Sequence, residues 1–290
     1  MTVPAVEQAL SWFTRNEFIL AELAREAHAR GDAATCWSLT DSLAPYLKRR
    51  GAWARQRDIQ ELGLRASSAL GSDQAGHSAL SLARALYGLG DHTSAAYVLD
   101  EAAQFFKEAD DRSGEADVFL TSSDWSLTAG DFQEALDLAN TSLSICAEIG
   151  DTVGTGRALN GAGWDLIQMG HPEKAKQLCQ EALTLLEAAS DLTGLAITWD
   201  SVGECHRMAG SFDDAIECFA TAASLAEDIQ AFPLAAEVLT RLGECHDENR
   251  DPDGALRAWS RAAQALQREA IPDAAALAAL HDRIRKHTGS

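Results

Sequence analysis

Two cysteine–histidine pairs, Cys205–His206 and Cys245–His246, stand 40 residues apart in the segments "SVGECHRMAG" and "RLGECHDENR". Two thiolates and two imidazoles would complete a tetrahedral zinc site. Neighbouring residues of a helix point about 100° apart, however, so an adjacent Cys–His pair is a poor chelate. We therefore interpret the pairs as positions of an internal repeat, and we expect free thiols, no metal and no cofactor.

A 40-residue repeat accounts for this spacing. The glycine before Glu-Cys-His has small residues at the equivalent positions of the other units, which are Ala83, Ser123, Gly163, Gly203 and Gly243. Seven residues after these stand Gly90, Gly130, Gly170, Gly210 and Arg250, and twelve residues after them stand Ala95, Ala135, Ala175, Ala215 and Ala255. The five units stay in step over residues 72–270, which indicates a repeat protein.

Each unit is predicted to be an antiparallel pair of helices. In the fourth unit, one face of the first helix carries Trp199, Val202, Gly203 and His206, because these residues recur at helical spacing. Gly210 is placed to end this helix and Ser211 to cap the next one. The second helix presents a stripe of Ala215, Phe219 and Ala222. Small residues in these stripes allow the two helices to approach closely.

The whole chain, residues 1–290, is predicted to form one all-α solenoid. Its parts are a leading helix (1–31), a degenerate helix pair (32–71), the five repeats (72–270) and a final helix (271–290). The final helix is expected to cap the apolar end of the array, because the last repeat of a solenoid otherwise exposes its core face.

Composition and charge restrict the partners. The formal net charge is −20, and residues 61–290 carry 16 Lys and Arg against 37 Asp and Glu. Such an acidic protein is poorly suited to bind nucleic acid or an anionic membrane directly. The sequence has no run of 18 apolar residues and no secretory signal, so a cytoplasmic protein is expected. One basic segment, "KRRGAWARQR" (48–57), is either the solvated edge of a helix pair or a docking patch for an acidic partner.

The sequence carries no signature of catalysis. It contains no GxxxxGK[ST], HExxH or GxSxG motif, which would indicate phosphate binding, a zinc protease or a serine hydrolase. The glycine-rich "GTGRALNGAG" (154–163) lies in the repeat register rather than after a strand, so it does not indicate a dinucleotide site. An enzyme that uses surface carboxylates stays open as the less favoured alternative to a non-catalytic protein.

The repeat resembles the tetratricopeptide repeat. The family pattern W-x2-L-G-x2-Y…G…A-x3-F-x2-A reads here as Trp199, Val202, Gly203, His206, Gly210, Ala215, Phe219 and Ala222. The period departs from the family's 34 residues, and the closing proline is missing. The resemblance implies a right-handed superhelical solenoid whose first helices line a concave groove that binds a protein or peptide segment.

Helical geometry selects the side chains that such a groove would expose, about 80–160° away from the core face. They are Arg84, Tyr87, Leu120, Asp124, Arg157, Asn160, Trp164, Asp200, Glu204, Arg207, Thr240 and Glu244. We expect Asn160 and Trp164 to anchor the ligand from an exposed position, and Arg157 and Arg207 to pair with its carboxylates. The many carboxylates favour a ligand that has apolar bulk and positive charge.

The chain as a whole resembles the C-terminal repeat region of actinobacterial STAND and antibiotic-regulatory (SARP-type) transcriptional regulators. The segments that carry this resemblance are "WFTRNEFIL", "LAPYLKRRGAW" and "LGECHDENRDPDGALRAW". It implies a sensor or partner-binding arm in transcription regulation, without its own catalytic activity. A small-molecule sensor with its ligand near Trp164 is the main alternative, and homo-oligomer formation stays open.

Overall fold

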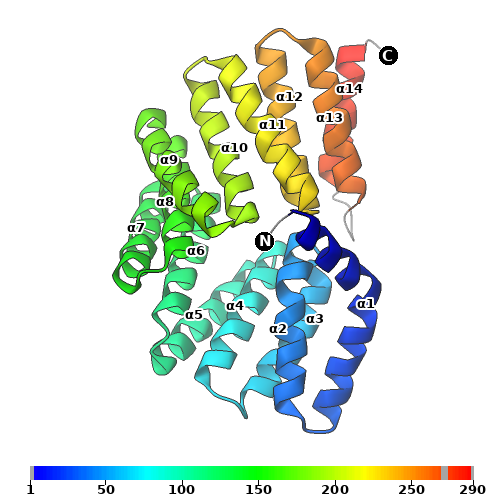
Figure 1. Cartoon of the computed structure of the whole chain (residues 1–290), viewed down its shortest axis with the longest axis vertical. Coiled ribbons are helices and arrows are strands. Elements are labelled where there is room, and N and C mark those ends of the chain that lie inside the picture. The colour runs from blue at the N-terminus through cyan, green and yellow to red at the C-terminus, as the bar shows by residue number, and fades with distance from the viewer. Residues whose placement is uncertain (1–2, 269–273, 289–290) are drawn as a thin grey trace. The chain divides into compact units, whose positions relative to one another are not determined.

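A computed structural model describes residues 3–268 and 274–288, which form α-helices joined by short turns and contain no strand (Figure 1). The helices are α1 (Val3–Ala29), α2 (Ala33–Arg49), α3 (Trp53–Ser67), α4 (Ser72–Gly88), α5 (His92–Ala109), α6 (Arg112–Ala129), α7 (Phe132–Ile149), α8 (Thr152–Gln168), α9 (Pro172–Ala189), α10 (Leu192–Met208), α11 (Phe212–Asp228), α12 (Phe232–Glu248), α13 (Pro252–Gln267) and α14 (Ala274–Thr288). The all-α prediction is confirmed. No helix in the described ranges is both long and apolar enough to cross a bilayer.

Helix pairs follow the 40-residue register. The first helix of each repeat is α4, α6, α8, α10 or α12, and the second is α5, α7, α9, α11 or α13. The helices end where the chain adopts a left-handed conformation. Residues with positive φ recur about every 20 positions from Gly90 onward, at Gly90, Asp110, Gly130, Gly150, Gly170, Ser190, Gly210, Gln230 and Arg250. The predicted glycine stops are therefore confirmed, and a second left-handed residue ends each second helix from α5 to α11.

The small residues that recur in each repeat have a packing cause. A Cβ added at Gly203 would lie 2.8 Å from the Phe219 ring, and one at Gly243 would lie 2.3 Å from Trp259 Nε1. These glycines let the first helix lie directly against an aromatic side chain of its own second helix. One capping prediction needs correction: Ser211 occupies the N-cap position of α11, but its hydroxyl accepts no capping hydrogen bond.

The chain divides into two compact units, residues 1–121 and 122–290. In the second unit, a large core cluster joins α10 to α14 and includes Phe219, Leu239 and Trp259. A neighbouring cluster joins α8 to α11 around Leu159 and Leu186. The boundary falls within α6, and the expectation of a single solenoid over the whole chain stays a prediction.

The last described helix, α14, packs against the fifth repeat. Leu280 is buried in the core cluster of the second unit, and Leu277 and Ile284 pack against that cluster. These contacts are those expected of a cap. The first residues of the predicted capping segment (271–273) and its last two (289–290) lie outside the described residues.

Candidate functional site

The first helices of the second unit leave only a narrow exposed strip. α10 lies between α9 and α11 and also contacts α8 and α12, and ten of its residues are buried. Its polar residues therefore project towards neighbouring first helices, where we define the polar face. It consists of Trp164 on α8; Asp200, Glu204 and Arg207 on α10; Glu237, Arg241, Glu244, Asp247 and Glu248 on α12; and Arg283 and His287 on α14.

Arg241 connects three first helices. Its Nε and Nη2 atoms donate to the two carboxylate oxygens of Asp200 at 2.8 and 2.7 Å. Its guanidinium carbon lies 5.5 Å from the centre of the Trp164 ring on α8, which is within the range of a cation–π contact. Glu237, one turn earlier on α12, lies 3.9 Å from the same guanidinium. Arg241 thus sits among one aromatic ring and two carboxylates.

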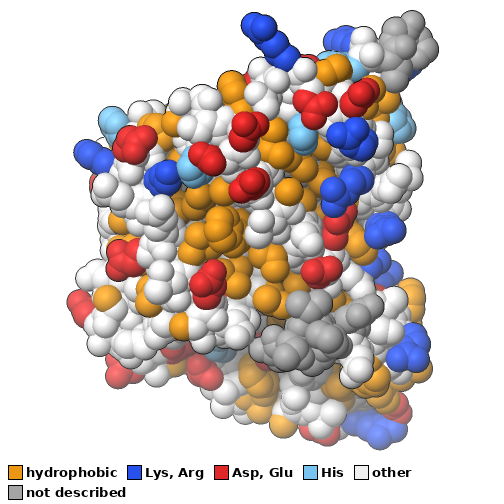
Figure 2. All heavy atoms as spheres, turned by 45° about the horizontal axis from the view of Figure 1, so that its top comes forward, with side chains coloured by type: hydrophobic (Ala, Val, Ile, Leu, Met, Phe, Trp, Pro, Cys, Tyr) orange, Lys and Arg blue, Asp and Glu red, His pale blue; other side chains and the backbone are white. Residues whose placement is uncertain are grey.

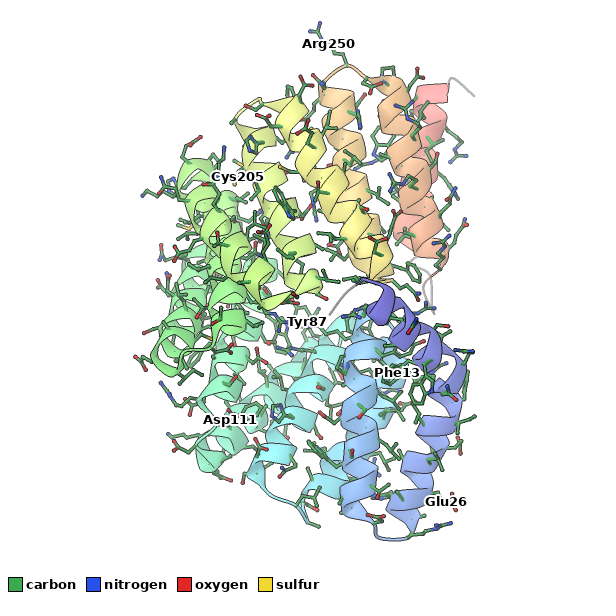
Figure 3. The ribbon with its side chains drawn as sticks, viewed as in Figure 1. Phe13, Glu26, Tyr87, Asp111, Cys205 and Arg250 are labelled. Carbon is green, nitrogen blue, oxygen red and sulfur yellow. The ribbon has the colours of Figure 1, made fainter. Side chains whose placement is uncertain are left out.

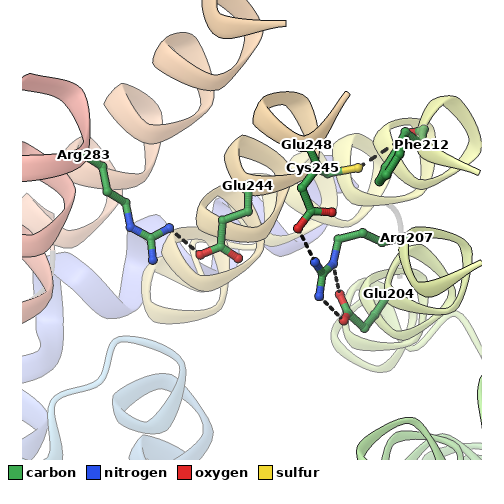
Figure 4. A network of polar contacts seen from close by, with 7 residues as sticks. All are labelled: Glu204, Arg207, Phe212, Glu244, Cys245, Glu248 and Arg283. Carbon is green, nitrogen blue, oxygen red and sulfur yellow. Dashed lines mark hydrogen bonds and ion pairs between the residues drawn. The ribbon is translucent and has the colours of Figure 1, made fainter. Parts of the chain in front are cut away.

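A second set of ion pairs continues the polar face towards α14 (Figure 4). Arg207 donates through Nε and Nη2 to Glu204, at 2.8 and 2.6 Å, and through Nη1 to Glu248 on α12 at 2.6 Å. Arg283 of α14 pairs with Glu244. Each bidentate arginine–carboxylate contact fixes orientation as well as charge, because the planar guanidinium matches the carboxylate.

His287 completes this set on α14. Its Nε2 lies 2.9 Å from Asp247 Oδ1. The hydrogen bond with the Arg283 carbonyl and the contact with Asp247 raise the pKa of His287.

Burial and pairing act against each other on the pKa values in this face. Burial raises the pKa of Asp200, and the Arg241 guanidinium lowers it by less. The residues around Glu237 also desolvate its carboxylate and raise its pKa, again against the effect of Arg241, although 67% of the side chain is exposed. Hydrogen bonds to Glu204 raise the pKa of Arg207. The two central arginines therefore stay charged, and the Arg241 charge favours the ionised forms of Asp200 and Glu237 against the effect of desolvation.

Several predicted site residues on α8 are less accessible than expected. Asn160 is buried, and its Oδ1 atom faces the Cys179 thiol of α9 at 3.9 Å. Trp164 is half-buried rather than exposed and packs with Ile167, Ala175 and Cys205. Arg157 is exposed, but its Nε donates to Asp191 at 2.8 Å. The expected exposure is therefore wrong for Asn160 and too high for Trp164, and the role of these residues as ligand anchors stays a prediction.

The same correction applies to α10. Asp200 and Glu204 were expected on the exposed face, yet they are 4% and 8% exposed. Arg207, expected to receive ligand carboxylates, already binds Glu204 and Glu248. The physical reason is that second helices cover a first helix on two sides. A residue that points away from one core face can therefore still be buried by a neighbouring helix.

The remaining predicted residues fall into both units. In the first unit, Arg84 Nη2 donates to Thr121 Oγ1 at 2.8 Å, Tyr87 packs against His92, and Leu120 is half-buried. In the second unit, Asp124 is exposed and Glu244 is part of the polar face. Thr240 donates its hydroxyl hydrogen to the Ala236 carbonyl at 2.7 Å.

Sequence reasoning missed Arg241, Glu248 and Arg283. A signal for them was present, because oppositely charged residues recur about one repeat apart. The pairs Asp200–Arg241 and Arg207–Glu248 are separated by 41 residues, Asp247–His287 by 40 and Glu244–Arg283 by 39. Stacked repeats bring equivalent positions together, so opposite charges at this spacing predict ion pairs between first helices.

The opening Cys–His pairs make separate contacts, in which each cysteine packs towards the preceding repeat and each histidine faces the following turn or helix start. Cys205 on α10 (Figure 3) and Cys245 on α12 are buried. Their histidines face the next turn, with His206 Nδ1 3.6 Å from Asp214 and His246 Nδ1 2.9 Å from Asp251. The pairs serve as packing and turn contacts, as the repeat interpretation predicts.

A different donor set lies in the first unit. Asp73, His77 and Asp111 place one ligand atom each within 4.8 Å of one another, and no other such group occurs among the described residues. Asp111, just before α6 (Figure 3), also accepts hydrogen bonds from the Ser113 and Gly114 amides. Two carboxylates and an imidazole suit a divalent cation, but the same contacts also fit ion pairs of a protonated histidine.

The basic segment 48–57 has partners within the first unit. Arg55 pairs with Glu17 and lies over the Phe18 ring at 4.7 Å. Arg57 donates to Asp58. These contacts fit the interpretation of a helix-pair edge, and they leave the docking alternative untested.

The fold is that of an α-solenoid built from helix–turn–helix repeats, and two segments identify the repeat. Residues 123–188 and 206–275 each match a family model described as tetratricopeptide repeat. Tetratricopeptide repeats are therefore present in these two segments, both of which lie in the second unit. No curated protein sequence matches the chain significantly.

Solved structures of low sequence identity share the fold. The Cut9–Hcn1 hetero-tetramer of the APC/C matches with a TM-score of 0.63 and 17% identity, over 92% of this chain and 45% of that one. A STAND protein from Pyrococcus horikoshii with a tetratricopeptide repeat sensor matches with 0.60 and 16%, over 98% and 44%. A Rap protein complexed with competence and sporulation factor matches with 0.64 and 13%, over 93% and 86%.

Proposed function

We propose that the chain is a non-catalytic binding module, in which the polar face of the second unit holds a peptide or protein segment. The observation that carries the proposal is the continuous set of charged side chains joined across α10, α12 and α14, with Trp164 at its edge. Charged side chains fixed in this way form a pre-organised surface, which reduces the entropy lost on binding.

Tetratricopeptide repeats are generally scaffolds for protein interaction, which supports a binding role. The Rap protein is complexed with competence and sporulation factor, and the Pyrococcus protein has a tetratricopeptide repeat sensor. The finer part of the proposal is that the chain is the sensor or partner-binding arm of a bacterial transcriptional regulator. It rests on the whole-chain resemblance to actinobacterial regulators.

The surface of the molecule suits a ligand of mixed character. On the face drawn in Figure 2, hydrophobic side chains gather in the middle, and acidic and basic side chains are interspersed around them. Patches that bind partners combine an apolar centre with polar groups that set orientation.

A displayed library of random 12-residue peptides, selected on the purified chain, tests the proposal. Selected peptides should lose affinity for Trp164→Ala by about 2 kcal/mol or more, the usual threshold for a residue that dominates an interface. Because Trp164 is half-buried, Trp164→Leu is tested beside it, and circular dichroism checks that both variants fold. Tyr97→Ala is the matched control, because Tyr97 is an exposed aromatic residue on a second helix.

Three outcomes would contradict the proposal. The library yields no peptide that binds; both Trp164 variants retain full affinity; or Tyr97→Ala reduces affinity as much as Trp164→Ala. A small molecule that raises the melting temperature through Trp164, in the absence of any peptide ligand, would instead favour the sensor alternative.

A further inference from the structure

α12 presents one continuous stripe on the polar face. Glu237, Arg241, Glu244 and Glu248 follow one another at intervals of four, three and four residues. At 100° per residue, two side chains that are 11 residues apart on a helix point in directions that differ by only about 20°. Glu237 and Glu248 therefore lie at the two ends of the same stripe.

Each central arginine is shared between an inner and an outer carboxylate. Arg241 binds Asp200 with both oxygens and also faces Glu237, and Arg207 binds Glu204 with both oxygens and also Glu248. The inner side chains, Asp200 and Glu204, are 5% and 10% exposed, whereas the outer ones, Glu237 and Glu248, are 67% and 41% exposed. With all groups ionised, each set of three carries a formal charge of −1.

The other two pairs of the polar face do not offset this excess. Glu244 and Arg283 balance each other. Asp247 faces His287, which is at most singly positive. The excess negative charge is therefore located at the outer carboxylates, Glu237 and Glu248, which solvent and a ligand can reach.

We propose that Glu237 and Glu248 bind two basic side chains of one extended peptide segment. The proposal rests on the proposed function and names the chemistry of its ligand. Eleven residues of helix place these carboxylates about 16 Å apart along the α12 axis. An extended chain rises about 3.3 Å per residue, so the same distance spans about five residues. Side chains of an extended chain alternate between its two faces, so only an even separation directs both towards α12. The ligand then carries Lys or Arg side chains four or six residues apart, since long basic side chains tolerate a small mismatch.

This arrangement disfavours other ligands. Arg207 and Arg241 are each occupied by two carboxylates, so neither offers a complete guanidinium to an acidic peptide. A single metal ion cannot bridge two carboxylates about 16 Å apart. The positive charge of a basic ligand would also favour the ionised form of Glu237, whose pKa desolvation raises.

Fluorescence anisotropy with matched peptides tests the spacing. The probes are labelled 14-residue Gly/Ser/Ala peptides with two arginines separated by two, four or ten positions, and a fourth with two glutamates separated by four. At low salt the arginine pair at four should bind tightest, and the glutamate peptide should not bind. Added salt should weaken the binding, because the contacts are between exposed charges.

Charge-neutralising variants test the two carboxylates. Glu237→Gln and Glu248→Gln should each weaken the four-spaced arginine peptide by about 1.4- to fivefold, the range of an exposed ion pair of 0.2–1 kcal/mol. The double variant should bind all three arginine peptides equally. Glu227→Gln is the control, because Glu227 forms a comparable exposed pair with Arg261 on the second helices.

The proposal is overturned if the four-spaced arginine peptide binds no more tightly than the glutamate peptide. It is also overturned if affinity is independent of spacing, or if Glu227→Gln has the same effect as the α12 variants. These results leave the proposed function intact when library peptides still depend on Trp164. Failure of both experiments rejects the proposed function itself.

Discussion

Two interfaces between neighbouring first helices, here called joints, each bury a carboxyl group, but the groups that compensate for its burial differ. Where α6 meets α8, Asp165 is 2% exposed, and Ser123 donates a hydroxyl to it at 3.3 Å. Where α10 meets α12, Asp200 is 4% exposed and binds the Arg241 guanidinium with both oxygens. The two carboxyl groups stand at different positions of the repeat, since Asp165 follows Gly163 by two residues and Asp200 precedes Gly203 by three, and only Asp200 is paired with a cation.

The difference shows what a buried carboxyl needs in this scaffold. Burial raises the pKa of Asp165 to about 7, and the Ser123 hydroxyl lowers it by less. Burial also raises the pKa of Asp200, but there the Arg241 charge opposes it. The α6–α8 joint is therefore expected to respond to pH near neutrality, and the α10–α12 joint to the loss of either partner.

The largest effect is expected for Asp165 as the pH changes. Its pKa of about 7 in the folded protein exceeds the value of about 3.9 in an unfolded chain. The folded state therefore keeps its proton while the unfolded state loses it, and stability falls as the pH rises from about 4 to 7. Relative to Asp165→Asn, the free energy of unfolding of the wild-type chain should fall by up to about 4 kcal/mol between pH 4 and pH 8.

Urea unfolding at a series of pH values measures this difference. Asp137→Asn, at an exposed position of α7, should leave the pH dependence of the wild-type chain unchanged. Parallel curves for the wild-type chain and Asp165→Asn would show that the two joints do not differ in this way.

A smaller effect is expected at the other joint. Asp200→Asn leaves the Arg241 guanidinium without its bidentate partner, and unfolding should need about 3 kcal/mol less free energy, the lower part of the range for breaking a buried pair. The partial exposure of Arg241 and the nearby Glu237 keep the loss from being larger. The measurement is urea unfolding at pH 7.

Two companion variants make this result specific. Glu227→Gln breaks an exposed pair on the second helices and should cost no more than about 1 kcal/mol. The double variant Asp200→Leu, Arg241→Met should recover much of the loss, because it leaves no buried charge unpaired. A loss in the double variant larger than in Asp200→Asn would argue that packing, rather than charge, controls this joint.

The smallest effect concerns the turns that lead into α8 and α12. Gly150 and Gln230 end the preceding helices at φ 72° and 53°, so the same left-handed position holds glycine before α8 and glutamine before α12. Gln230→Gly should stabilise the chain by about 0.5–1 kcal/mol, since a left-handed conformation strains a residue that has a Cβ. Gly150→Ala should destabilise it by a similar amount. Thermal unfolding measures both, and shifts in the same direction would contradict the argument.

The repeat and its helix pairs could be predicted because each depends on residues close in the sequence. The left-handed stops at Gly90, Gly130, Gly170 and Gly210, and the small residues opposite Phe219 and Trp259, follow directly from the 40-residue register. The candidate site could be predicted only in part. The helices and several residues were identified, but the exposure of Asn160, Trp164 and Asp200 was overestimated, because neighbouring repeats cover a first helix from two sides.

The sequence by itself determined the all-α repeat, the acidic charge and the absence of familiar catalytic motifs, since composition and local periodicity carry that information. Only the tertiary structure decided which charges meet. Arg241 reaches Asp200 on one neighbouring helix and Trp164 on the helix beyond it, whereas Asp165 finds only a hydroxyl. Such contacts depend on the stacking of repeats and on side-chain reach, and the position of a residue within its own helix does not specify either.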